Sequence, residues 1–180
     1  MVVFDATFLS HLLYTDSRPP LDPSTKQPVE RAKERVEYLV ETLWDAKQKI
    51  TIPAPALAEL LAVASNPQEL LEVIDSSRWF EIYPFDQRAA VECAELVRAA
   101  IRPGGKKDLT STWAKAKFDY QVIAIAIVVG ADTIYTDDED IPRYLAGKPM
   151  RVIRIADLPL PPPKQMPLYD AGESDAEQDD

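Results

Sequence analysis

Residues 117–141 read KFDYQVIAIAIVVGADTIYTDDEDI and give the clearest indication of the fold class. Its first part is almost wholly apolar and ends near a glycine, which predicts a buried helix over residues 118–131. The next residues, DTIYT at 132–136, predict a short strand, and a run of acids follows it directly. A buried helix that leads into a short strand is typical of α/β proteins, in which helices cover a parallel sheet.

The rest of the chain repeats this alternation of strand and helix. We expect further strands at 2–4, 49–53, 79–85 and 150–155, and further helices at 6–14, 29–49, 55–65, 68–77, 86–102 and 141–147. The pattern favours a three-layer α/β/α fold with a mostly parallel central sheet of four or five strands. Residues 2–4, VVF, lack the alternation of a half-exposed strand, so we place them in the sheet interior. Right-handed crossovers would bring the C-terminal ends of the strands to one edge, where such sheets bind ligands.

Composition sets the domain organisation and the expected location. The chain has 180 residues and a net charge of −10, and we place one domain at residues 1–159. Residues 160–180 are rich first in proline and then in acids, so we expect a mobile tail there. No apolar run reaches the roughly 20 residues of a membrane helix, and no basic segment of a secretory signal precedes the first apolar residues. We therefore expect a cytoplasmic protein with no membrane partner.

Carboxylates follow several of the predicted strands or open helices that face the same edge of the sheet. They are Asp5, Glu59, Asp119, Asp137, Asp138 and Asp140. Two like charges about 4 Å apart repel by about 4 kcal/mol at an effective dielectric near 20, so such a cluster calls for a cation. Oxygen ligands suit Mg²⁺ or Mn²⁺. His11 and Cys93 are the only residues of their types, which disfavours a zinc site built from nitrogen and sulfur.

Each acid also has a simpler interpretation. Asp5 and Asp119 could cap their helices by accepting backbone N–H groups. Glu59 could lie on a solvated helix face, and residues 137–140 could form an ordinary polar turn. Their common position at one edge of the predicted sheet is what favours a metal site.

Three stretches resemble the PIN-domain ribonucleases, and among them the VapC-type toxins. They are VVFDATFLSHLL at 2–13, PAPALAELL at 53–61 and the opening stretch at 117–141, and together they extend over the whole chain except the tail. The resemblance implies that Asp5, Glu59, Asp119 and Asp138 form the catalytic, metal-binding quartet, oriented by hydrogen bonds from Thr136.

The resemblance leaves one ligand open. Asp137 stands where asparagine or a basic residue is common in the family, so the fourth ligand is either Asp137 or Asp138. Asp140 matches a frequent family acid and is expected to support the site. The loop DSRPPLDPSTKQP, residues 16–28, and the tail look like additions to the shorter toxin-type members.

By resemblance, the function is that of an endoribonuclease, a hydrolase that cleaves RNA phosphodiester bonds with Mg²⁺ or Mn²⁺ and serves as the toxin of a toxin–antitoxin pair. In such chemistry the metal lowers the pKa of the water that attacks phosphorus. The resemblance also implies an antitoxin protein as partner and a homodimer. The segment RPGGKKDLTSTWAKAK, residues 102–117, predicts a basic rim for RNA. Its lysines are Lys106, Lys107, Lys115 and Lys117.

Other classes fit the sequence less well. A phosphatase of the haloacid dehalogenase type needs an acid two residues after the first, and that position is Thr7. A dinucleotide-binding domain needs a glycine-rich turn after the first strand, where this chain reads DATFL. A non-catalytic PIN-like scaffold that binds RNA or protein partners is the alternative that the sequence leaves open.

Overall fold

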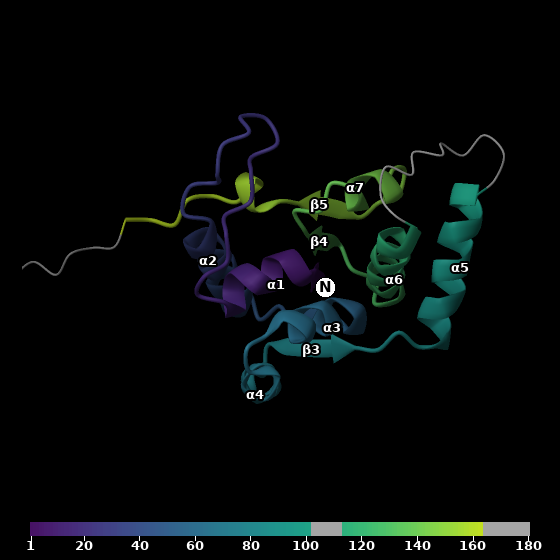
Figure 1. Ribbon diagram of the computed structural model, residues 1–180, viewed down its shortest axis with the longest axis horizontal. Coiled ribbons are helices and arrows are strands. Elements are labelled where there is room, and N and C mark those ends of the chain that lie inside the picture. The colour runs from purple at the N-terminus through teal and green to yellow at the C-terminus, as the bar shows by residue number, and fades with distance from the viewer. Residues whose placement is uncertain (102–112, 164–180) are drawn as a thin grey trace, which may run out of the picture.

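The computed structural model describes residues 1–101 and 113–163, which form an α/β fold around a parallel sheet of five strands (Figure 1). The strands are β1 (Val2–Phe4), β2 (Ile50–Pro53), β3 (Phe80–Tyr83), β4 (Thr133–Tyr135) and β5 (Arg151–Ile153). The helices are α1 (Ala6–Leu13), α2 (Ala32–Asp45), α3 (Ala54–Val63), α4 (Pro67–Ser76), α5 (Gln87–Ile101), α6 (Trp113–Val128), α7 (Ile141–Tyr144) and the 3₁₀ turn η1 (Ile155–Asp157).

Strand β1 lies at the centre of the sheet. The strand order is β3-β2-β1-β4-β5, and each neighbouring pair is parallel. Val2 pairs with Ile50 on one side and with Thr133 on the other, and the whole strand is buried. The predicted three-layer fold, the parallel sheet and the interior position of residues 2–4 are therefore confirmed. The C-terminal ends of β1 and β4, which carry the acids of interest, are adjacent.

Successive residues of β1 point to opposite faces of the sheet and enter two separate cores. Val2 and Phe4 pack with α1, α2 and α4, whereas Val3 packs with α5, α6 and α7. Helix α3 contributes residues to both cores. Figure 1 shows α1 and α2 together on one side of the molecule and α5 and α6 together on the other.

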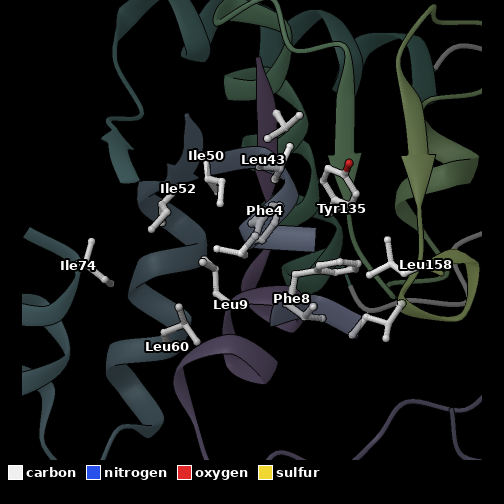
Figure 2. Packing of buried hydrophobic residues seen from close by; sticks show 14 of the residues in the cluster. Phe4, Phe8, Leu9, Leu43, Ile50, Ile52, Leu60, Ile74, Tyr135 and Leu158 are labelled. Carbon is white, nitrogen blue, oxygen red and sulfur yellow. The ribbon is translucent and has the colours of Figure 1, made fainter. Parts of the chain in front are cut away.

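Three aromatic rings fix α1 against the sheet. The ring centroid of Phe8 lies 5.4 Å from that of Phe4 on β1 and 5.4 Å from that of Tyr135 on β4, and the Phe4 and Tyr135 centroids are 5.1 Å apart. Figure 2 shows this group beside Leu9 and Leu158. Edge-to-face packing of this kind adds to the stability that burial of the rings supplies. It holds the start of α1 next to the ends of both strands.

Helix α6 is longer than the sequence suggested. It begins at Trp113 rather than at Phe118 and ends at Val128, three residues before the predicted end but close to Gly130, as expected. Gly130 adopts a left-handed φ of 64°, and the N–H of Ala131 donates to the carbonyl of Ala126 at 2.9 Å, which closes the helix in the manner typical of glycine. The early start adds more than one turn before Asp119, and that turn carries Lys115.

Some of the predictions concern residues that the structure does not describe. Lys106 and Lys107 lie outside the described residues, as do residues 164–180, so the domain boundary at 159 and the mobile tail stay predictions. Helix α2 begins at Ala32 and ends at Asp45, so it is shorter than the helix predicted at 29–49. In the described ranges, no helix has the length and apolarity that a membrane span requires.

The aromatic group supplies a test of the fold. We expect Phe8→Ala to lower the free energy of unfolding by about 3–5 kcal/mol, because Phe8 has no exposed surface and its removal leaves a cavity beside two other buried rings. Phe85→Ala is the matched control, since that ring is 38% exposed, and it should cost less than about 1 kcal/mol. Urea denaturation followed by circular dichroism measures both. Equal losses for the two variants would contradict the packing.

Candidate metal centre

Asp5 occupies two structural roles at the end of β1. Its Oδ1 caps α1 by accepting the backbone N–H groups of Thr7 at 3.0 Å and Phe8 at 3.1 Å, together with the Thr7 hydroxyl at 2.7 Å. Its Oδ2 accepts a hydrogen bond from the hydroxyl of Thr136, which follows β4. The helix-cap interpretation of Asp5 therefore holds, and the same carboxylate also reaches across to the neighbouring strand.

Two threonine hydroxyls connect Asp5 to the acidic turn after β4. The Thr136 hydroxyl donates to Asp5 and accepts the N–H of Asp138 at 3.0 Å. The Thr7 hydroxyl also donates to Asp5 and accepts the N–H of Asp137 at 3.1 Å. Each hydroxyl thus uses its one donor and an acceptor position to hold the turn at a fixed place relative to Asp5.

Three carboxylates converge beside this network. Oxygens of Asp119, Asp138 and Asp140 all lie within 4.8 Å of one another. Asp119 comes from α6 and is 8% exposed, and nothing in the described part of the chain donates a hydrogen bond to its buried Oδ2. A buried carboxylate oxygen without a donor is costly unless a cation approaches it. We refer to these three residues as the acidic triad.

Two cationic side chains contact the acidic triad. The Lys115 ammonium lies 2.6 Å from Oδ2 of Asp138, 2.8 Å from Oδ2 of Asp140 and 3.8 Å from Oδ2 of Asp119. The Arg143 guanidinium pairs with Oδ1 of Asp140. These contacts offset part of the negative charge. Asp138 and Asp140 line a hollow of about 500 Å³, whose wall also includes Thr7, Lys115 and Arg143.

The remaining candidates lie around the triad. Glu59 is on the exposed side of α3, close enough for its charge and that of Asp138 to repel. Asp137 lines the same hollow but lies outside the triad. Its Oδ1 accepts the N–H of Ile155 at 3.2 Å, which fixes the start of η1, and its buried Oδ2 accepts no hydrogen bond from the described residues. Of the two residues that the sequence left open, Asp138 is thus the one beside Asp119. Lys117 lies on an exposed part of α6.

The acids group differently from the quartet predicted from the sequence in one respect. Asp140, expected as a supporting acid, belongs to the triad, whereas the carboxylate of Asp5 is engaged by α1 and by Thr136. Asp5 still contributes negative charge at Asp119, so both acids lie at the same edge of the sheet. No role was predicted from the sequence for Arg143 or for the Thr7 hydroxyl. The spacings of three residues from Asp140 to Arg143 and of two from Asp5 to Thr7 are the sequence features that could have indicated these contacts.

Burial makes ionisation of these acids unfavourable. It raises the pKa of Asp5 to about 6, although hydrogen bonds from Thr136, Thr7 and Phe8 oppose the change.

Burial and then the charge of Asp138 raise the pKa of Asp119 to about 6, against the attraction of Lys115. Partial burial, together with the charge of Asp138, also raises the pKa of Glu59. For Lys115, desolvation acts to lower the pKa, but the surrounding carboxylates outweigh it and raise the value.

Comparison with known protein families identifies the chain. The family model described as PIN domain matches residues 28–145. The chain belongs to the PIN domain family. PIN domains are nucleases, and the match confirms the family that the sequence motifs indicated. Among curated proteins, no significant match was found.

Solved structures share the fold of this PIN domain. VapBC2 from Rickettsia felis, bound to a DNA fragment from their promoter, gives a TM-score of 0.57 at 17% identity over 86% of this chain and 98% of that chain. DNA-bound VapBC from Salmonella typhimurium gives 0.52 at 14% identity over 86% and 97%. VapC20 from Mycobacterium tuberculosis, a Sarcin-Ricin loop cleaving toxin, gives 0.50 at 14% identity over 84% and 99%. At these identities the likeness establishes the fold alone.

The carboxylate set of this PIN domain fits a hard divalent cation. Its donors are all oxygens, it has an excess of negative charge, and Asp119 offers an oxygen that accepts no hydrogen bond from the described residues. Mg²⁺ and Mn²⁺ prefer such ligands. Asp119, Asp138 and Asp140 are the side chains that could hold the ion, with Asp5 and Glu59 adjacent.

The raised pKa of Asp119 predicts how stability depends on pH in the metal-free protein. A folded pKa near 6 exceeds the ordinary value of 3.8, so the folded state binds more protons between about pH 4 and 6, and stability falls as the pH rises through that range. We expect Asp119→Asn in EDTA to raise the free energy of unfolding by about 1–3 kcal/mol at pH 7, and the gain to vanish near pH 4.

Urea denaturation at pH 4, 5, 6 and 7 measures this difference. Asp16→Asn, in an exposed loop position, is the matched control and should show little gain at any of these pH values. A loss of stability for Asp119→Asn at pH 7 would contradict the account, because it would mean that the folded state favours the charged form.

Proposed function

We propose that this PIN domain is a metal-dependent endoribonuclease that uses the acidic triad, with Asp5 and Glu59, to hold Mg²⁺ or Mn²⁺. The observation that carries the proposal is the approach of three carboxylate oxygens to within 4.8 Å in a member of a nuclease family. Lys115 and Arg143 offset only part of the charge that the triad, Asp5 and Glu59 bring to this edge of the sheet, and like charges at this separation repel. A divalent cation supplies further counter-charge and prefers the ligand type that is present.

The metal supplies Lewis-acid chemistry when bound: it stabilises negative charge on a phosphate oxygen and favours ionisation of a water molecule. Asp119, Asp138 and Asp140 would hold it. Asp5, held on both oxygens, keeps the turn after β4 in register with α1. Carboxylate oxygens at this edge that do not bind the ion can accept the proton that the attacking water loses.

Basic side chains near the triad support RNA as the substrate. The net charge of −10 repels a polyanion overall, so binding has to come from local positive charge. Lys115 and Arg143 line the hollow at the triad, and Lys117 is exposed on the same helix. Lys106 and Lys107, outside the described residues, would extend this basic rim. Ammonium and guanidinium groups contact phosphate oxygens along a strand without reading its sequence.

The structural neighbours support the toxin assignment by analogy. One is named as a toxin that cleaves the Sarcin-Ricin loop, and two are VapBC complexes bound to DNA. We accordingly propose RNA as substrate, an antitoxin protein as partner, a homodimer as the assembly and the cytoplasm as location for this chain.

One observation favours the alternative of a non-catalytic PIN-like scaffold. The ammonium of Lys115 already contacts all three acids of the triad, and a site neutralised permanently in this way would bind RNA or protein without cutting. The two functions differ in one respect that can be measured, namely whether divalent cations are required for, and support, RNA cleavage.

Cleavage assays with intact ribosomes and total cellular RNA test the proposal. We expect cleavage in Mg²⁺ or Mn²⁺, its loss in EDTA, and its return when metal is restored. Asp119→Asn and Asp138→Asn should each reduce the rate at least about 100-fold, since each removes a ligand charge. Asp16→Asn is the matched control and should retain full activity. Cleavage that persists in EDTA, or in both triad variants, would contradict the proposal.

A further inference from the structure

The position of Lys115 relative to the acidic triad has a specific consequence for metal binding. Lys115 lies on the early part of α6, four residues before Asp119, so the two side chains share one face of the helix. Its ammonium contacts the same three carboxylates that form the triad. An ammonium at this point stands where a metal ion would have to bind.

The oxygens that remain available in Asp138 and Asp140 are the ones that Lys115 contacts. Oδ1 of Asp138 accepts the N–H of Asp140 at 2.7 Å, and Oδ1 of Asp140 pairs with Arg143. The other oxygen of each residue, Oδ2, lies 2.6 Å and 2.8 Å from the Lys115 ammonium. A metal ion would need these Oδ2 atoms at about 2.0–2.1 Å. Two cations bound to the same oxygens would lie within a few ångströms of each other and repel strongly.

We infer that Lys115 is an internal cation of the acidic triad in the metal-free protein, and that a divalent cation must displace it in order to bind. The inference rests on the proposed metal centre and adds a competing residue to it. Lysine suits this role because its charge is carried by a long, flexible stem with freely rotating donors.

Lysine rather than the carboxylates is the group that can move. The side chain of Lys115 is 46% exposed, whereas those of Asp119, Asp138 and Asp140 are 11%, 18% and 9% exposed. The acids are also held by the backbone bonds of the turn and by Arg143. Rotation of the Lys115 side chain toward solvent would free both Oδ2 atoms without a change in the backbone.

Calorimetric titration of Mn²⁺ into the full chain tests the inference. Lys115→Met removes the competing ammonium, and we expect it to bind Mn²⁺ about tenfold more tightly than the wild type, a factor that corresponds to about 1.4 kcal/mol. Lys117→Met is the matched control: it removes the same charge two residues further along α6 and should change the affinity much less. Lys115→Gln, measured in parallel, keeps a polar side chain and should behave like Lys115→Met.

Thermal unfolding provides a second readout that does not depend on activity. In EDTA, Lys115→Met should melt at a lower temperature than the wild type, because the triad loses its counter-charge. Saturating Mn²⁺ should then raise its melting temperature by more than it raises that of the wild type, in line with the tighter binding.

The outcomes separate this inference from the proposed function. Equal or weaker Mn²⁺ affinity in both Lys115 variants, with binding retained by the wild type, would overturn the displacement of Lys115 and leave the metal centre intact. Absence of Mn²⁺ binding in the wild type and in every variant would overturn the metal centre and the inference together. Tighter binding in both Lys115 variants but not in Lys117→Met would support the inference.

Discussion

The carboxylate of Asp5 is the connection on which the arrangement of the site depends. One of its oxygens caps α1, and the other accepts the hydroxyl of Thr136 at the end of β4. The central position of β1 makes this possible, because β4 is its direct neighbour in the sheet. The aromatic contacts among Phe4, Phe8 and Tyr135 hold the same two strands and α1 from the core side. The aromatic packing in the core and the hydrogen bonds of Asp5 thus together fix the C-terminal ends of β1 and β4 relative to α1.

The region around the C-terminal ends of β1 and β4 carries more negative than positive charge. Burial raises the pKa of Asp5 and Asp119 to about 6, so at neutral pH the fold holds carboxylates in a form that the surroundings disfavour. Lys115 and Arg143 offset this only in part. Sites that store unfavourable charge at a cost in stability are commonly functional. A divalent cation relieves the repulsion, which links the stability of the protein to the chemistry proposed for it.

The fold could be predicted from local sequence patterns. The apolar run at residues 122–129 and the unbroken strand at 2–4 indicate burial on all sides, which only a covered parallel sheet provides. The edge at which Asp5, Asp119 and Asp138 meet follows from the handedness of the crossovers.

The finer geometry could not be predicted in this way. Whether Asp137 or Asp138 turns toward Asp119 depends on a backbone bond from Ile155, which lies in a distant element. Lys115 was expected on a basic rim because the start of α6 read as a loop. Once the helix begins at Trp113, the spacing of four residues also brings Lys115 to the acids. The place of Asp140 in the triad likewise depends on the side-chain directions within one tight turn.

The most direct test of the central claim is an anomalous-diffraction map of the crystalline protein soaked in Mn²⁺. We expect one strong anomalous peak in contact with the carboxylate oxygens of Asp119 and Asp138, at the edge of the sheet where β1 and β4 end. A well-ordered acidic triad with no anomalous peak beside it, at Mn²⁺ concentrations that support RNA cleavage, would contradict the claim that these carboxylates form the metal centre.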